Sequence, residues 1–243
     1  MQTSDATRTA PPALDCNRDA LFLDFDGTLV EIAPRPDAIL VPPDLGARLN
    51  RLGAACNGAL AVVSGRDLAT LAQFLPEFDG VMVGSHGAEA RGLTLDLPQA
   101  DPAAVQAALG AFAAQQSLLF EEKSHGGALH YRTRPEAAAE IAAFMADLVA
   151  KHPAFEVQPA KMAFELRPRG ASKDRAMAAL ARLPAFAGRR PVYLGDDTTD
   201  EPALAWAGAQ GGYGIKVGPG ESAARHGLAG PAEVLQWLAE GEV

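Results

Sequence analysis

Residues 20–29 read Ala-Leu-Phe-Leu-Asp-Phe-Asp-Gly-Thr-Leu, and the apolar run at their start ends in the carboxylate of Asp24. A short continuous run of this kind fits a strand that is buried on both faces of a parallel sheet. In open α/β sheets, ligands bind beyond the carboxyl ends of the strands, where Asp24 would lie. This stretch therefore predicts a strand of the sheet and the position of a functional site.

Four further apolar runs repeat the pattern, and helical patterns lie between them. The runs cover residues 60–63, 81–83, 192–194 and 215–217. The helical patterns cover residues 44–55, 67–74, 172–183 and 200–207. Strands that alternate with helices predict an α/β fold with a doubly wound, Rossmann-like parallel sheet.

The middle of the chain differs, because helical patterns there are mixed with alternating stretches. Residues 101–116 and 135–151 look helical, and residues 93–97 and 155–166 alternate. Residues 118–132 hold two strand-like stretches around a predicted turn at Gly126-Gly127. We therefore expect a smaller α+β domain inserted into the α/β core. The predicted parts are a disordered or extended lead-in at 1–18, a core at 19–90 and 169–243, and the insert at 91–168.

The composition limits the classes of protein. Of the 243 residues, 48% are hydrophobic and 21% charged, which is typical of a globular chain and not of a disordered one. The 21 basic and 30 acidic residues give a net charge of −9, which argues against nucleic-acid binding but permits a small anionic substrate. No run approaches the roughly 18 apolar residues of a membrane span, and residues 1–20 lack the apolar core of a secretory signal.

We therefore expect a cytoplasmic protein, a monomer or weak dimer, with no membrane or nucleic-acid partner. Cys16 and Cys56 form no metal-binding spacing. A structural disulfide between them is not expected in a cytoplasmic chain.

Asp24 and Asp26 are spaced for chemistry at phosphorus. Two carboxylates at a strand end and in the next turn can converge on Mg²⁺, which prefers hard oxygen ligands. A carboxylate can also attack phosphorus to form an aspartyl phosphate, while a second acid protonates the leaving oxygen and then deprotonates water. Gly27 permits the tight turn. Taken alone, the same residues fit an Asx-turn or a fragment of a calcium loop, although the later ligands of an EF-hand do not follow.

Three later segments favour the catalytic interpretation. Ser64 follows an apolar strand, where it would bind a phosphate oxygen or cap a helix. Lys173 lies at another helix start, where it would neutralise a phosphate or a carboxylate, or face solvent. Residues 195–201 read Gly-Asp-Asp-Thr-Thr-Asp-Glu, and the repulsion among their four carboxylates favours a bound cation. Asp200 could instead cap the helix that follows.

In this order the segments resemble the haloacid dehalogenase superfamily of Mg²⁺-dependent phosphohydrolases. The resemblance implies that Asp24 is the nucleophile and Asp26 the general acid and base. It implies that the phosphoryl oxygens are held by Thr28, Ser64 and Lys173. It also implies a metal site formed by Asp24, Asp26, Asp196, Asp197 and Asp200, the last two in supporting roles.

Further stretches resemble trehalose-6-phosphate phosphatases over nearly all of residues 20–240. These stretches are Leu-Val-Glu-Ile-Ala-Pro at 29–34, Ser-Gly-Arg at 64–66, Gly-Ser-His-Gly-Ala-Glu at 84–89, Leu-His-Tyr-Arg at 129–132 and Glu-Leu-Arg-Pro at 165–168. In that family the insert is a cap that closes over the sugar. The resemblance therefore implies substrate contacts from Gly65, Arg66, Glu121, Lys123, Arg132, Lys161 and Glu165.

The implied function is hydrolysis of trehalose 6-phosphate to trehalose and phosphate, with Mg²⁺ and an aspartyl-phosphate intermediate, as the last step of trehalose biosynthesis. A phosphatase for another sugar phosphate or phosphorylated glycoside is the alternative with the same fold. A phosphomutase would transfer the phosphate to a second sugar. A non-catalytic binding protein is disfavoured, because such a relative would be expected to lose Asp24, Asp26 or Lys173.

Four positions leave questions open. The family often has glycine where this chain has Ala160 and Asp174, next to Lys161 and Lys173. These departures bear on substrate contacts more than on the chemistry. His86 fits a contact in the active site or a structural role, and His125 is expected to be a solvated hairpin residue.

Overall fold

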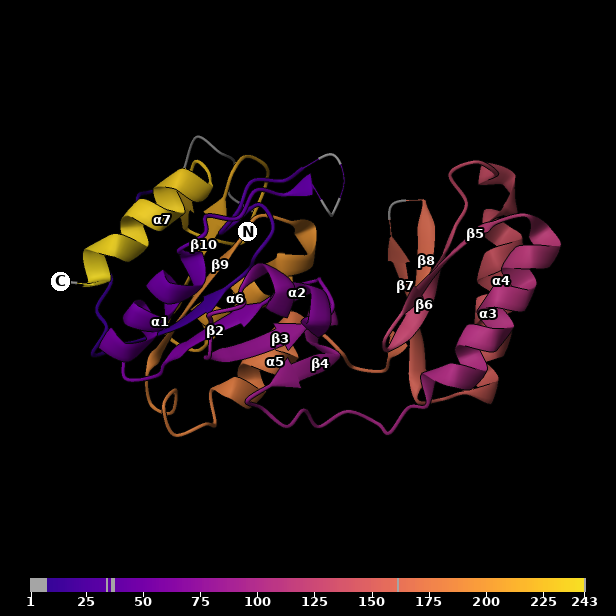
Figure 1. Cartoon of the computed structure of the whole chain (residues 1–243), viewed down its shortest axis with the longest axis horizontal. Helices are drawn as coiled ribbons and strands as arrows, with labels where there is room; N and C mark the ends of the chain where they lie inside the picture. The colour runs from indigo at the N-terminus through magenta and orange to yellow at the C-terminus, as the bar shows by residue number, and fades with distance from the viewer. Residues whose placement is uncertain (1–7, 34, 36–37, 161, 243) are drawn as a thin grey trace. The chain divides into compact units, whose positions relative to one another are not determined.

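The chain forms two compact units in the computed structural model, which describes residues 8–33, 35, 38–160 and 162–242 (Figure 1). The core unit comprises Met1–Leu95 and Ser172–Val243, and the inserted unit comprises Asp96–Ala171. The sequence placed the limits of the insert at residues 91 and 168. No helix among the described residues is long and apolar enough to cross a membrane.

The core unit is built on a seven-stranded sheet of order β11-β10-β9-β1-β2-β3-β4. Its strands are β1 (Asp19–Leu23), β2 (Leu60–Val63), β3 (Val81–Gly84), β4 (Glu89–Arg91), β9 (Arg190–Gly195), β10 (Tyr213–Val217) and β11 (His226–Leu228). Every neighbouring pair is parallel except β3 with β4, which is antiparallel. The predicted α/β fold with a parallel sheet is confirmed.

Helices cover both faces of this sheet (Figure 1). They are α1 (Leu45–Ala55), α2 (Leu68–Phe74), α5 (Lys173–Leu180), α6 (Glu201–Ala209) and α7 (Pro231–Ala239). From β1 to β3 the chain moves one way along the sheet, and from β9 to β11 it moves the other way. Right-handed crossovers then place α1 and α2 on one face and α6 on the opposite face.

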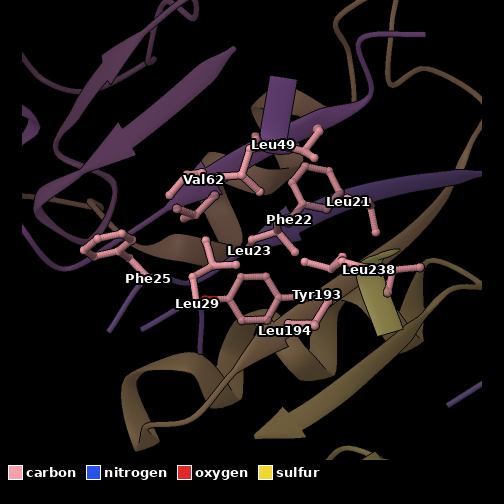
Figure 2. Close-up of a cluster of buried hydrophobic side chains, with 14 of the residues drawn as sticks. Leu21, Phe22, Leu23, Phe25, Leu29, Leu49, Val62, Tyr193, Leu194 and Leu238 are labelled. Atoms are coloured by element: carbon pink, nitrogen blue, oxygen red, sulfur yellow. The ribbon is translucent and has the colours of Figure 1, made fainter. Parts of the chain in front are cut away.

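Double coverage explains why β1 is a continuous apolar run. All of its residues are buried, and Figure 2 shows its side chains packed among those of β2 and β9, with Leu49 of α1 and Leu238 of α7 nearby. Phe22 also packs on the ring of Phe186, with centroids 5.4 Å apart. Such dense burial fixes the end of β1, and with it the position of Asp24.

The inserted unit has an antiparallel sheet of order β5-β6-β8-β7. Its elements are α3 (Pro102–Gln116), β5 (Leu119–Lys123), β6 (Gly126–His130), α4 (Ala138–Lys151), β7 (Phe155–Ala160) and β8 (Ala163–Pro168). Both helices lie on one face of the sheet (Figure 1). Their apolar residues form a separate core with Leu129 and Leu166.

One local prediction in this region is wrong. The hairpin turn falls at residues 124–125 instead of Gly126-Gly127, and the alternating residues 93–97 form no strand. Both glycines belong to β6, where they allow close packing. A Cβ atom at Gly126 would lie only 2.1 Å from the carbonyl oxygen of Leu166.

The expectation that the two cysteines are unpaired is also wrong, because Cys16 and Cys56 form a disulfide. Cys16 lies just before β1, and Cys56 lies at the C-terminal end of α1. The crossover helix runs opposite to the parallel strands, so its end returns to the level where β1 begins. The fold therefore brings together two cysteines whose sequence contexts look unrelated.

Residues 8–18, part of the predicted lead-in, run along one side of the core unit. Thr9 pairs with His226 of β11 in a parallel bridge. The indole N–H of Trp237 in α7 donates to the carbonyl of Pro12 at 2.9 Å. The segment is thus attached to the sheet, to α7 and, through Cys16, to α1.

Loss of the disulfide is expected to lower the free energy of unfolding by about 2–4 kcal/mol, because the bond restricts a 40-residue separation in the unfolded chain. Urea unfolding with and without dithiothreitol measures this effect. The double variant Cys16→Ala/Cys56→Ala is the control. Its free energy of unfolding should equal that of the reduced protein and should not change with dithiothreitol. Coincident wild-type curves in the two conditions would contradict the prediction.

Candidate active site

The candidate active site lies at the carboxyl ends of three adjacent parallel strands of the core unit. Asp24 directly follows β1, Ser64 follows β2, and Asp196 follows β9. Since β1 lies between β9 and β2 and all three strands are parallel, these residues begin at the same carboxyl end of the sheet. The winding direction of the chain reverses at this point, which is where open α/β sheets bind their ligands.

Lys173, the first residue of α5, is the buried cation of the site. Its Nζ donates to Oδ1 of Asp24 at 2.7 Å and to Oδ1 of Asp200 at 2.6 Å. All three side chains are buried. Lys173 is therefore not a solvent-facing lysine, and two carboxylates share its single ammonium group.

Burial and charge shift the pKa values of this cluster. Burial raises the pKa of Asp24 well above its usual range, Lys173 opposes this rise, and Asp200 adds to it. Burial lowers the pKa of Lys173, but attraction to Asp24 and Asp200 outweighs that effect, so its pKa lies above the ordinary value. Burial and the charges of Asp200 and Asp197 raise the pKa of Asp196 to about 6. The excess of negative charge favours a further cation.

The side chains present fit a divalent metal ion. Carboxylate oxygens of Asp24, Asp196 and Asp200 lie within 4.8 Å of one another. Such an all-oxygen set suits Mg²⁺. Gly27, at φ +73°, makes the arrangement possible, because a Cβ atom there would lie 2.1 Å from Oδ2 of Asp196.

Asp200 is held through both of its carboxylate oxygens. Besides the bond from Lys173, Oδ1 accepts one from the hydroxyl of Tyr193 at 2.5 Å, and Oδ2 accepts one from the N–H of Asp197 at 3.0 Å. Burial and the charge of Asp200 raise the pKa of Tyr193 well above its usual range, so the phenol stays a donor. Sequence analysis missed Tyr193, because an aromatic residue inside an apolar strand resembles any other core residue.

Asp197 lies outside the cluster of three carboxylates formed by described residues. Its carboxylate accepts a hydrogen bond from the N–H of Thr198 at 2.6 Å and caps η5 (Thr198–Asp200). Its effect on the cluster is electrostatic, since its charge helps to raise the pKa of Asp196.

Lys216 of β10 is a second buried lysine that sequence analysis missed. Its Nζ donates to the carbonyl oxygens of Asp196 at 2.7 Å, Val217 at 2.7 Å and Pro219 at 3.0 Å. Burial lowers its pKa, and the charge of Asp196 opposes that change. Three acceptors match the three protons of an ammonium group. Lys216 therefore ties the Asp196 loop to the turn after β10.

Arg66 binds the predicted general acid. Its Nε donates to Oδ2 of Asp26 at 2.7 Å, and its Nη2 donates to Oδ1 at 2.6 Å. The guanidinium group also lies over the ring of Phe74, 4.9 Å from its centroid. This forked, stacked pair fixes the orientation of the Asp26 carboxylate.

Thr28 and Ser64 provide two buried hydroxyl groups in the segments that follow β1 and β2. Oγ1 of Thr28 is buried and has no hydrogen-bond partner among the described residues, which suits a group that donates to a bound ligand. Ser64 does not cap α2, because Asp67 is the N-cap and accepts from the N–H of Thr70 at 2.8 Å. Instead, Oγ of Ser64 accepts from the N–H of Arg66 at 3.1 Å.

A strained segment supports the loop that contains Ser64. Ser85, His86 and Gly87 have backbone φ values of +50°, +53° and +102°, a region that residues other than glycine rarely adopt. The N–H of Ser85 donates to the carbonyl of Arg66 at 2.7 Å, and that of His86 donates to the carbonyl of Ser64 at 3.0 Å. The His86 ring approaches Gly65 so closely that a Cβ atom there would lie 2.5 Å from it. His86 thus lies next to the site.

Of the predicted substrate contacts of the insert, Glu121, Lys123 and Glu165 lie on strands of its own sheet. Nζ of Lys123 lies 2.8 Å from Oε2 of Glu165, and Nε2 of His130 lies 2.8 Å from Oε2 of Glu121. Arg132 is exposed just after β6, and Lys161 lies outside the described residues. The expectation of a solvated His125 is wrong: its side chain is only 5% exposed, because it packs beside Glu165.

Comparison with known proteins gives consistent matches along the chain. The family model "Trehalose-phosphatase" matches residues 22–232. Trehalose-6-phosphate phosphatase of Escherichia coli K12 is 36% identical over 225 residues, which are 90% of this chain and 85% of that protein. A probable trehalose-phosphate phosphatase of Sinorhizobium fredii is 39% identical over 211 residues, covering 84% and 80% of the two chains.

Solved structures agree at the level of the fold. A trehalose-6-phosphate phosphatase of Aspergillus fumigatus superposes with a TM-score of 0.67 at 26% identity, covering 95% of this chain and 98% of that one. A haloacid dehalogenase-like hydrolase of Bacteroides thetaiotaomicron superposes with a TM-score of 0.59 at 16% identity, covering 92% and 98%. The second likeness extends the fold to a wider group of hydrolases.

Proposed function

The chain belongs to the trehalose-phosphatase family and is a phosphoric monoester hydrolase, and from this premise we propose that it hydrolyses trehalose 6-phosphate through an aspartyl phosphate on Asp24. The observation that carries the mechanism is the buried Asp24–Lys173–Asp200 cluster at the end of β1. It holds one carboxylate in a fixed position, next to a cation and a second acidic group. This arrangement suits attack on phosphorus.

In the first step an oxygen of Asp24 attacks phosphorus, and the bond from phosphorus to the sugar oxygen breaks. Asp26 gives its proton to the departing sugar oxygen, so trehalose leaves as a neutral alcohol. In the second step water attacks the aspartyl phosphate, and Asp26 takes the proton of that water. Phosphate is released, and the carboxylate of Asp24 is restored.

The remaining groups of the site would bind and orient the phosphoryl group. We assign phosphoryl-oxygen contacts to Thr28, Ser64 and Lys173, all three of which are buried. Arg66 would hold Asp26 in line with the leaving oxygen. Mg²⁺, bound through the carboxylates of Asp24 and Asp196 and the main-chain carbonyl of Asp26, would offset the negative charge on nucleophile and substrate.

The inserted unit would act as the cap and bind the sugar. Carboxylates accept hydrogen bonds from sugar hydroxyls, and cations can assist them or the phosphate. We propose sugar contacts from Glu121, Lys123, Arg132, Lys161 and Glu165.

A substrate panel tests this function. Phosphate release with Mg²⁺ is measured on trehalose 6-phosphate, sucrose 6-phosphate, glucose 6-phosphate and 4-nitrophenyl phosphate. We expect kcat/KM for trehalose 6-phosphate to exceed the others by about a hundredfold or more, as sites that hydrogen-bond their substrate can achieve. If kcat/KM for another sugar phosphate equals or exceeds that for trehalose 6-phosphate, the proposed substrate is wrong. Isomerised phosphate without release would indicate a mutase.

A further inference from the structure

One face of the inserted sheet is open, and its side chains can be read from the strand register. Glu121 pairs with Ala128, Ala128 with Glu165, and Glu165 with Gln158. Directly paired residues point to the same face of a sheet. The alternate residues Leu129 and Leu166 belong to the core formed with α3 and α4. The row that contains Glu165 therefore lies on the face opposite the helices.

On this open face an ion pair crosses a whole strand. Lys123 belongs to β5 and Glu165 to β8, and β6 lies between them. Their 2.8 Å contact is possible because β6 presents only Gly126 and Ala128 beneath it. Ala128 is only 3% exposed on this face, where the pair spans the strand that contains it. Lys123 and Glu165 thus form one side of a built polar cluster.

His125 completes this cluster from the turn between β5 and β6. Its Nε2 lies 3.4 Å from Oε1 of Glu165, while Lys123 occupies Oε2. An ionised carboxylate only accepts hydrogen bonds, so Nε2 is the donor in this contact, and each oxygen of Glu165 has a partner of its own.

We infer that His125 is a positioning and specificity-determining residue for the sugar. With Lys123 it holds both oxygens of Glu165 in one orientation. A carboxylate fixed in advance loses less conformational entropy when the substrate binds. The inference rests on the proposed role of Glu165 in sugar binding. It adds a residue that neither the motifs nor the family resemblance indicated.

The variant His125→Ala tests this role. We expect KM for trehalose 6-phosphate to rise about tenfold with little change in kcat, as when uniform binding energy is lost. Activity on 4-nitrophenyl phosphate, which has no sugar, should stay within about twofold. His125→Gln should recover most of the loss, because its side-chain amide can replace the Nε2–H donor. His152→Ala, a substitution at the end of α4, is the control and should leave both substrates unaffected.

A double-mutant cycle separates positioning from general damage. In a Glu165→Gln background, His125→Ala should change KM by less than about twofold, because the carboxylate that it positions is gone. Unchanged KM in the single variant, or equal losses on the sugar and aryl substrates, would overturn the inference. If the wild type prefers a different sugar phosphate, the proposed substrate fails. In that case, KM of His125→Ala relative to KM of the wild type, both measured on the preferred sugar phosphate, still tests the role of His125.

Discussion

Asp24→Asn is expected to lower the rate of phosphate release by at least about ten-thousandfold, because an amide cannot replace the carboxylate that we propose attacks phosphorus. Stopped assays with trehalose 6-phosphate and an aryl phosphate measure the loss on both. Asp79→Asn, a substitution of an exposed aspartate in the same unit, should retain wild-type activity. A residual rate above about one per cent would place the nucleophile elsewhere.

The same substitution should not destabilise the protein. Burial raises the pKa of Asp24 well above its usual range, so the folded state disfavours the charged form of this group more than the unfolded state does. A neutral amide carries no such cost of burial, and Lys173 keeps its bond to Asp200. We expect the thermal midpoint to stay level or rise. A large fall would show that the lost activity reflects unfolding.

Lys173→Met is expected to damage both stability and activity. It leaves Asp24 and Asp200 buried without their shared cation, and removing one partner of a buried ion pair typically costs about 3–5 kcal/mol. Urea unfolding measures this loss, and phosphate release should fall by about a thousandfold.

A second substitution supplies the control for Lys173. The double variant Lys173→Met/Asp24→Asn should be more stable than Lys173→Met alone, because one of the two stranded charges is gone. Additive losses, or wild-type stability in the single variant, would mean that the three groups do not act as one electrostatic unit.

The sequence predicted those parts of the site that are tied to a recognisable local pattern. Asp24 and Asp196 directly follow apolar strands, and Lys173 begins a helix. The α/β pattern alone therefore predicts that they lie at the same end of the sheet. Tyr193 and Lys216 lie inside strands, where sequence position alone does not reveal a polar contact. Their roles depend on atoms that are distant in sequence, and only the packed sheet supplies those partners.

Long-range geometry also explains the failures. The cysteine pair depends on the return of α1 to the start of β1, which residue spacing does not encode. His125 was misjudged because a polar residue in a hairpin turn is usually solvated. Its burial comes from a side-chain pair that spans the neighbouring strand.

The segment from residue 8 to residue 18 has a consequence for self-association. β11 ends the sheet on one side, and the unpaired edge of a strand can recruit a strand from another molecule. Thr9 bonds to the backbone on both sides of His226, and the Nη1 of Arg8 donates to the carbonyl of Gly220 at 2.8 Å. The two bonds of Thr9 occupy part of the open edge of β11. The segment therefore leaves less of the β11 edge free to pair with a strand of another molecule.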